Sequence, residues 1–281
     1  MGSSTLRRVS GAIAAVALAA LAAGVVRASV GPPEQRGIFA LLGGTPKILS
    51  EFWAVQGTGL SATLQIRQLA LDGKTPILNY DADMEKLIHL VVVRDDFATF
   101  AHLHPTFEAT TGIFAQRFTK EPNHRYYVYA DTVPRHLGQQ VFRFTMESDG
   151  PAAAYKLATA PSSTSSVAAP YMVTLARTTL AANQAQTLSI TIFEGGRPAR
   201  NLGTYLGALA HAIFIDISTL EYAHVHAMAR GSTMSMGMPA QPGPFMQMTL
   251  PPFPAGTYKL WIQFSGARGL VYTAPFTILV R

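Results

Sequence analysis

The sequence predicts an all-β protein that contains two tandem immunoglobulin-like β-sandwich domains. Three observations support this fold class. Short segments with strand-like patterns alternate with Gly-, Pro- and Asp-rich turns along most of the chain. Helical periodicity is convincing only near the N-terminus. One histidine pattern also occurs twice at identical spacing, which indicates an internal repeat with about 100 residues per copy, the usual size of such a domain.

Residues 1–28 are expected to be a signal peptide. Arg7 and Arg8 form a basic start, Val9–Val26 is apolar and rich in Ala, and Ala28 ends an acceptable small-residue cleavage site. The alternative is an uncleaved N-terminal anchor, because about eighteen apolar residues can just span a bilayer. Either way we expect an exported protein, periplasmic or secreted.

The composition limits which molecules and metals the protein can bind. The net charge is +6, but the basic residues are scattered and form no run with interleaved aromatics, so we expect no nucleic-acid binding. There is no cysteine, so any metal must be held by His, Met or carboxylates. An exported, cysteine-free chain that carries His and Met suits an oxidising compartment in which copper is handled.

Residues 29–50 contain Gly-Pro-Pro and Gly-Gly and are expected to form a flexible lead-in. The first β-sandwich domain is expected at residues 51–150. Its candidate strands are Ala62–Leu71, Leu87–Val93, Ala98–His104, Gly112–Thr119, Tyr126–Ala130 and Val141–Met146. The first copy of the histidine pattern lies on the second and third of these strands.

Residues 151–170 are rich in Ala, Ser, Thr and Pro, so we expect a linker there. The second β-sandwich domain is expected at residues 171–281. Its candidate strands include Thr187–Phe193, Tyr258–Phe264 and Val271–Val280, and Tyr258–Phe264 matches Tyr126–Ala130 of the first domain. A proline (Pro76 or Pro198) lies thirteen residues before the first histidine of each copy (89 − 76 and 211 − 198), so the repeat extends beyond the histidines.

The histidine pattern is one histidine, twelve other residues, and then His-x-His. It comprises His89, His102 and His104 in the first copy and, 122 positions later (211 − 89), His211, His224 and His226. Six of the eight histidines belong to it, which is improbable by chance.

The spacing of each copy is typical of a β-hairpin. In the first copy Asp95–Asp96 is the expected turn, and Pro105 is expected to end the second strand. Side chains two apart on a strand share a face, so His102 and His104 lie together, and His89 falls opposite one of them. Cross-strand Cβ atoms lie roughly 5 Å apart. The second copy predicts the same arrangement around a turn at residues 216–220.

Three converging imidazoles are the ligand set of an open zinc site or of a copper site. We therefore predict one metal site in each domain, with copper as the metal and zinc as the alternative. An imidazole binds metal only when neutral, so affinity should fall as the pH drops through the free histidine pKa of about 6.5. The competing interpretation is that the histidines are structural, hydrogen-bonded polar groups.

A methionine-rich loop follows His226 in the second domain. Met234, Met236 and Met238 are separated by Gly and Ser and are candidate ligands, because thioethers prefer Cu(I). Met246 and Met248 are spaced by two on a predicted strand, where a place in the core is the expected role.

The sequences KLIHLVVVRDDFATFAHLHP and YLGALAHAIFIDISTLEYAHVH resemble a family of uncharacterised bacterial secreted proteins with repeated "aHlHP" hairpins, which look like distant relatives of YtkA-like and copper-resistance-C-like β-sandwiches. The resemblance covers roughly residues 60–150 and 180–281. It implies an immunoglobulin-like sandwich and heavy-metal handling. The N-terminal histidine ligand of copper-resistance-C-like proteins has no counterpart at the predicted mature start, Ser29.

Three functions compete at this point. The first is an extracytoplasmic metal-binding protein that buffers, delivers or detoxifies copper, with a membrane metal transporter or another extracytoplasmic protein as partner. The second is a structural or interaction module with structural histidines. The third is a two-domain copper-dependent oxidoreductase. No carboxylate base is placed within either motif, because Asp95, Asp96 and Asp216 lie in the turns, several residues from the histidines.

Overall fold

The computed structural model describes residues 25–26, 46–148, 150, 154–230 and 242–281. These residues form strands and loops, and the all-β prediction is confirmed for them. No α-helix occurs in this part of the chain, and η1 (Ala267–Gly269) is a short 3-10 turn. Within the same ranges, no helix has the length and apolar character that a bilayer span requires.

The predicted signal segment lies outside the described residues apart from Val25–Val26. These two residues form β1, which pairs antiparallel with β2 (Leu49–Gln56). The expected lead-in at residues 29–50 is described only from residue 46, and β2 begins inside its last residues.

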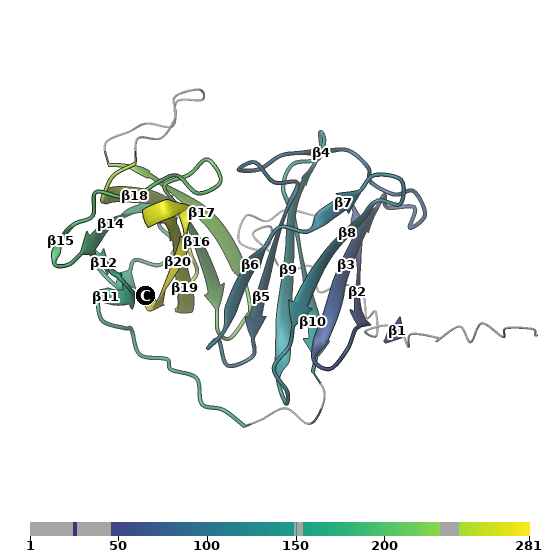
Figure 1. Cartoon of the computed structure of the whole chain (residues 1–281), viewed down its shortest axis with the longest axis horizontal. Helices are drawn as coiled ribbons and strands as arrows, with labels where there is room; N and C mark the ends of the chain where they lie inside the picture. The colour runs from purple at the N-terminus through teal and green to yellow at the C-terminus, as the bar shows by residue number, and fades with distance from the viewer. Residues whose placement is uncertain (1–24, 27–45, 149, 151–153, 231–241) are drawn as a thin grey trace, which may run out of the picture.

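The first half of the molecule consists of two antiparallel sheets (Figure 1). Besides β1 and β2, its strands are β3 (Ser61–Leu69), β4 (Tyr80–Asp81), β5 (Ile88–Arg94), β6 (Phe100–Leu103), β7 (Thr106–Glu108), β8 (Ile113–Thr119), β9 (Arg125–Pro134) and β10 (Gln140–Glu147). One sheet has the order β1-β2-β3-β8-β7 and the other β10-β9-β5-β6, with β4 added to β9. The sheets pack face to face, because β3 and β5 bury alternate residues such as Leu64, Ile66, Leu90 and Val92 in one core.

The second half forms a single ten-stranded sheet that curls around its own core as a half-barrel. Its strands are β11 (Ser165–Ala168), β12 (Tyr171–Leu175), β13 (Thr179–Leu180), β14 (Gln186–Glu194), β15 (Arg197–Pro198), β16 (Ala210–Asp216), β17 (Tyr222–Ala229), β18 (Phe245–Leu250), β19 (Gly256–Ser265) and β20 (Val271–Val280). Strand β11 pairs with β12 and lies inside the stretch that the sequence indicates as a linker, so the ordered second half begins before Tyr171.

Strand pairing in the two halves follows one scheme. Each histidine hairpin, β5–β6 or β16–β17, is flanked by a long strand, β9 or β19, and then by β10 or β20. One difference changes the sheet. Proline has no backbone N–H to give to a ladder, and Pro105 separates β6 from β7, whereas β17 runs without a break through the equivalent Ala227. In the second half this strand joins what are two separate sheets in the first half.

The two hairpins also pack against each other (Figure 1). A third apolar cluster lies between the halves. Its buried members are Val91, Val93, Phe97, Tyr129 and Val141 from the first half and Ile213, Ile215, Ile217, Tyr222 and Trp261 from the second. Strands β5 and β16 are therefore covered on both faces, which explains their continuous apolar sequences.

Candidate metal centre

The six patterned histidines lie on or beside the two hairpins, as the spacing predicts. In the second half, His211 on β16 pairs directly with His226 on β17, and His224 pairs with Ile213. In the first half, His102 on β6 pairs with Val91 on β5, so the same register continues to His89 opposite His104. The period of two along each strand thus brings three imidazoles of each hairpin to one face.

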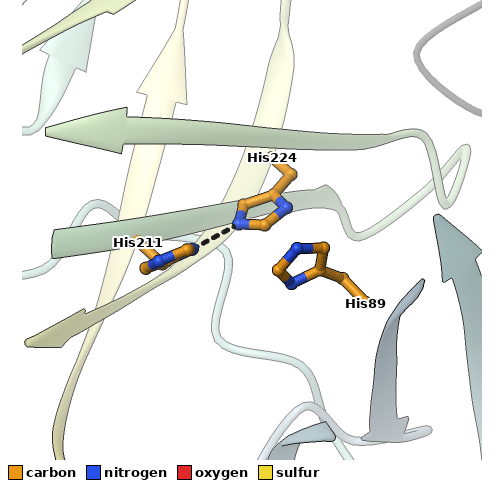
Figure 2. Close-up of side chains that lie close together, drawn as sticks. All are labelled: His89, His211 and His224. Atoms are coloured by element: carbon orange, nitrogen blue, oxygen red, sulfur yellow. Dashed lines mark hydrogen bonds between the residues drawn. The ribbon is translucent and has the colours of Figure 1, made fainter. Parts of the chain in front are cut away.

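Within each half, two histidines are hydrogen-bonded to each other. His89 Nδ1 lies 2.9 Å from His102 Nε2, and His211 Nδ1 lies 2.9 Å from His224 Nε2 (Figure 2). The second ring nitrogens of His89 and His211 are each hydrogen-bonded to a backbone carbonyl. His89 Nε2 donates to the carbonyl oxygen of Asp83, and His211 Nε2 donates to that of Tyr205, both at 2.9 Å.

These carbonyls determine the protonation pattern, because a carbonyl oxygen can only accept. His89 and His211 therefore carry their proton on Nε2, and their Nδ1 accepts from the neighbouring histidine. It follows that neutral His224 carries its proton on Nε2 and keeps a lone pair on Nδ1. His102 Nδ1 instead faces Oε1 of Gln263, which can only accept, so the contacts of the two His102 nitrogens compete for its single proton. The Nδ1 atoms of both histidines are directed toward the other half of the molecule.

Each half also places a polar side chain beside one histidine of the other half, which is His102 in the first half and His224 in the second. Gln263 on β19 lies 2.8 Å from His102 Nδ1, and Asp131 on β9 lies 3.6 Å from His224 Nδ1. Asp131 and Gln263 occupy equivalent positions, since Asp131 pairs with His89 and Gln263 with His211 in the strand register. The boundary between the halves is therefore a reciprocal exchange of polar groups.

Sequence reasoning did not identify Asp131 or Gln263. The match between Tyr126–Ala130 and Tyr258–Phe264 carried the signal, because Asp131 is the next residue of its strand and Gln263 holds the same place in the other. Two polar residues at one position of two matching strands, each following a mostly apolar run, indicate a shared role.

The two histidine triples form one cluster, not two separate sites. Ring centroids of His89 and His224 lie 5.0 Å apart, and those of His102 and His224 lie 5.3 Å apart. His211 and His89 are 5.9 Å apart. These distances between halves match those within a hairpin, such as 5.1 Å between His89 and His102. We name this set of six residues the histidine cluster.

Ligand atoms of the cluster group in three ways, in each of which all atoms lie within 4.8 Å of one another. The groups are His89 with His102 and His104, His89 with His211 and His224, and Asp83 with His224 and His226. Only the first lies within a single half. The predicted second triple, His211 with His224 and His226, is in ring contact. Two of its members, His211 and His224, also group with His89 of the first half (Figure 2).

Burial keeps the histidines neutral. Desolvation lowers the pKa of all six, and for all but His89 neighbouring histidines add to the effect because each would carry the same charge. The pKa falls to about 4 for His104 and His226 and to about 3 for His211. For His102 and His224 it lies well below the ordinary value. Neutral imidazole is the form that binds a metal.

Several polar atoms of the cluster lack a partner. Among the described residues, His104 Nε2, His224 Nδ1 and His226 Nε2 are buried and have no hydrogen-bond partner. A buried group without a partner is costly, and native proteins rarely leave one without a reason. Three such nitrogens in one cluster are consistent with a ligand that completes their coordination.

The pKa of one carboxylate beside the histidine cluster is also shifted. Burial raises the pKa of Asp131 to about 7, opposed by the hydrogen bond from Gln139. Asp131 therefore takes up or releases a proton near neutral pH, beside the lone pair of His224.

The remaining sequence predictions have mixed outcomes. Met246 and Met248 are buried core residues, as expected. Met234, Met236 and Met238 lie outside the described residues. Of the two histidines outside the repeated pattern, His136 is exposed, whereas His124 is half-buried and lies 3.0 Å from Asp95.

Residues 165–281 match a family described as a domain of unknown function (DUF8832). The match covers the second half of the molecule, including His211, His224, His226 and Gln263. No curated protein matches the chain.

Proposed function

We propose that this protein binds a transition metal in the histidine cluster and serves copper handling outside the cytoplasm, as a buffer, chaperone or resistance factor. Zinc is the alternative metal. The observation that carries this proposal is the group formed by His89, His102 and His104, whose ligand nitrogens lie within 4.8 Å of one another in a buried setting.

The geometry requires small ring rotations, with the single proton of His102 on Nδ1, where Gln263 Oε1 accepts it. A tetrahedral ion with metal–nitrogen bonds of ~2 Å holds its nitrogens ~3.3 Å apart. His89 Nδ1 and His102 Nε2 are at 2.9 Å, so binding replaces this hydrogen bond by two bonds to the metal. His104 Nε2, which has no partner in the described part of the chain, supplies the third.

The surroundings of the group support the same proposal. Metal-binding histidines usually donate their other ring N–H to a carbonyl or carboxylate, which fixes the ring and its tautomer. His89 does this with the Asp83 carbonyl, and His211 with the Tyr205 carbonyl. Imidazole ligands suit both copper and zinc, and the methionines at 234–238 would add a preference for Cu(I).

Two further parts of the proposal come from the sequence. The apolar segment within residues 1–28 supports export, and a partner such as a membrane metal transporter follows from a delivery role. We also propose that each half is an immunoglobulin-like β-sandwich, which the shared strand scheme and the two packed sheets of the first half support.

A structural role is the second candidate function. The hydrogen bonds between His89 and His102 and between His211 and His224 satisfy four ring nitrogens without any metal. In that case the cluster would fix the docking of the two halves, and the protein would act as an interaction module.

The decisive experiment is a titration with Cu(II), and separately with Zn(II), at pH 7. The His104→Ala variant removes one free nitrogen and leaves both histidine–histidine hydrogen bonds intact, so the fold should persist. We expect it to lose at least 10-fold in affinity, while His136→Ala, an exposed histidine of the same half, behaves like wild type. A wild-type protein that takes up neither metal would replace this proposal by the structural role.

A further inference from the structure

Asp83 belongs to the first half, but its carboxylate reaches histidines of the second half. A carboxylate oxygen of Asp83 and ring nitrogens of His224 and His226 all lie within 4.8 Å of one another. The backbone carbonyl of the same residue holds His89. Asp83 therefore lies beside both halves of the cluster, with its backbone carbonyl bonded to His89 and its carboxylate within 4.8 Å of ring nitrogens of the second half.

The turn that carries Asp83 sits at the boundary between the halves. Asp83 and Lys86 exchange backbone hydrogen bonds across Met84 and Glu85, both at positive φ. Equivalent bonds join Tyr205 to Ala208 in the second half. The two turns meet, since Glu85 Oε1 lies 3.6 Å from where a Cβ atom on Gly207 would be. This contact places the turn that carries Asp83 next to the equivalent turn of the second half.

The histidines that Asp83 meets have free coordination capacity. His224 is buried, and its Nδ1 has no hydrogen-bond partner among the described residues. The same holds for His226 Nε2. A carboxylate oxygen of Asp131 lies 3.6 Å from His224 Nδ1, beyond ordinary hydrogen-bond length. The two histidines that carry these unpartnered nitrogens thus each have a ring nitrogen within 4.8 Å of an Asp83 carboxylate oxygen.

We propose that Asp83, His224 and His226 form a second metal site that bridges the two halves and takes a divalent ion of the zinc or iron(II) class. This inference rests on the proposed metal-binding function of the cluster, but it uses a different donor set. Two imidazoles with one carboxylate are a common ligand set for catalytic zinc and for non-haem iron(II), whereas three imidazoles also suit copper.

Charge explains why this site differs from the all-histidine group. Three neutral imidazoles leave the full charge of a buried divalent ion uncompensated, and a carboxylate offsets part of it. The equivalent position in the second half is Tyr205 (205 − 83 = 122), a neutral phenol whose ring lies 6.4 Å from those of His102 and His104. The repeat therefore provides the mixed site on one side only.

The test compares Asp83→Asn with Asp81→Asn. Asp81 lies two residues away, is exposed and pairs with Arg135, so its variant is a matched control. Asparagine at position 83 keeps the backbone carbonyl that holds His89. Each purified protein is titrated with Zn(II) by calorimetry at pH 7 and then with Co(II), whose visible spectrum reports its ligands.

We expect Asp83→Asn to lower the affinity for one Zn(II) equivalent by at least 10-fold. Removal of a residue that only hydrogen-bonds a metal ligand already costs about 10–100-fold, and Asp83 is proposed as a direct ligand. Asp81→Asn should not change the Zn(II) affinity. His104→Ala should weaken the all-histidine group and spare the uptake that depends on Asp83. Asp83→His, which restores a ligand without the charge, should recover Zn(II) uptake with an altered Co(II) spectrum.

Two results would overturn the inference while the proposed function stands. The first is an Asp83→Asn protein that titrates like Asp81→Asn. The second is an Asp83→His protein that fails to recover uptake, since Asp83 would then act only through its charge. A wild-type protein that takes up no Zn(II), Co(II) or Cu(II) would instead remove the proposed function together with this site.

Discussion

The two halves of the molecule present the same hairpin to each other, but they contribute different chemistry. Where the first half has the carboxylates of Asp83 and Asp131, the second half has Tyr205 and Gln263 at the equivalent positions. Among the described residues, the two carboxylates placed beside the histidine cluster, Asp83 and Asp131, thus both come from the first half. The comparison indicates that the repeat conserves the scaffold of the site, while its electrostatics are asymmetric.

The apolar part of the boundary is nearly symmetric by contrast. Phe100 of the first half stacks on Trp261 of the second at 4.8 Å, and Tyr222 of the second stacks on Tyr129 of the first at 5.0 Å. The pairs occupy equivalent positions of the repeat, because Phe100 and Tyr222 are 122 residues apart (222 − 100). Docking is thus reciprocal, and differences between the halves should appear in ion binding and pH dependence.

The largest effect on copper binding is expected from His102→Ala combined with His224→Ala. If the triples were separate, the two losses in copper affinity would add, because distant sites rarely couple. The ring centroids of His102 and His224 are only 5.3 Å apart, so we expect the combined loss to differ from the sum by about 0.5–3 kcal/mol. Cu(II) titration of wild type, both single variants and the double variant at pH 7 measures this coupling.

Strict additivity in that cycle would mean that the halves bind metal independently. Unchanged copper uptake by the double variant would mean that the histidine triples are structural, and the interaction-module role would then replace metal binding.

The next effect concerns the symmetric stacks. Trp261 is 3% exposed and stacks on Phe100, so Trp261→Ala should destabilise the protein by about 3–5 kcal/mol. Phe100 is only partly buried, and Phe100→Ala should cost less. Urea unfolding measures both, and Leu270→Ala, an exposed residue of the same half as Trp261, should stay within about 0.5 kcal/mol of wild type. Equal costs for all three variants would contradict the assignment of the stack to the docking surface.

The third effect tests the charge asymmetry. The pKa of Asp131 is raised to about 7 in the folded state, above about 3.9 in the unfolded chain. The folded protein therefore binds more protons between these values, and stability from Asp131 is present below pH ~4 and lost as the pH rises to 7. Asp131→Asn removes this loss. The difference in free energy of unfolding between Asp131→Asn and wild type should therefore shift in favour of the variant by on the order of 2–4 kcal/mol as the pH rises from 4 to 7.5.

The reciprocal variant sharpens this comparison. Gln263→Glu places a buried carboxylate at the equivalent position of the second half, beside His102. Its stability should fall relative to wild type as the pH rises over the same range. Urea midpoints of wild type and both variants at four pH values measure these stability differences. If neither variant's difference from wild type changes with pH, the boundary does not hold a buried acid.

The histidines should act in the opposite direction. The pKa values of His104 and His226 are lowered to about 4, whereas unfolded histidine titrates near 6.5. The unfolded chain then binds more protons in this window, so the stability of the metal-free protein should fall as the pH drops from 6.5 to 4.

His104→Asn and His226→Asn should each reduce this acid loss by on the order of 1–3 kcal/mol, and by similar amounts because both pKa values are alike. Chemical unfolding of the metal-free proteins at pH 7 and pH 4.5 tests this. His136→Ala, at an exposed histidine, is the control and should leave the pH dependence unchanged. A wild-type protein equally stable at both pH values would exclude neutral burial of the cluster.

The hairpins could be predicted because strand periodicity and turn chemistry are local. The spacing of His89, His102 and His104 leaves one register in which all three share a face. The merging of both triples could not be predicted this way, since docking of two halves depends on contacts between distant residues. A signal was nevertheless present. The apolar runs of β5 and β16 do not alternate, which is typical of strands covered on both faces.

The roles of Asp83 and Asp131 were beyond sequence reasoning for a different reason. Both lie outside the hairpins, and a carboxylate near a turn or at a strand end is usually solvated. Only the pairing of β5 with β9 places Asp131 beside His89, and only the contact between the two turns brings Asp83 to the second hairpin. Tertiary contacts that are long in sequence decide which acids join the site.

The smallest effect is expected where the repeat differs in its backbone. Pro105 interrupts the strand that is continuous at Ala227, so Pro105→Ala tests whether this break matters for the site. Loss of a proline from a compatible position increases the freedom of the unfolded chain and should cost about 0.4–1 kcal/mol. Metal affinity should not change, because His102 and His104 precede the break. Ala227→Pro should cost more, since it removes a donor from the middle of a paired, buried strand. Urea unfolding and Cu(II) titration of the two variants give the comparison, and a drop in copper affinity for Pro105→Ala would show that the break itself positions His104.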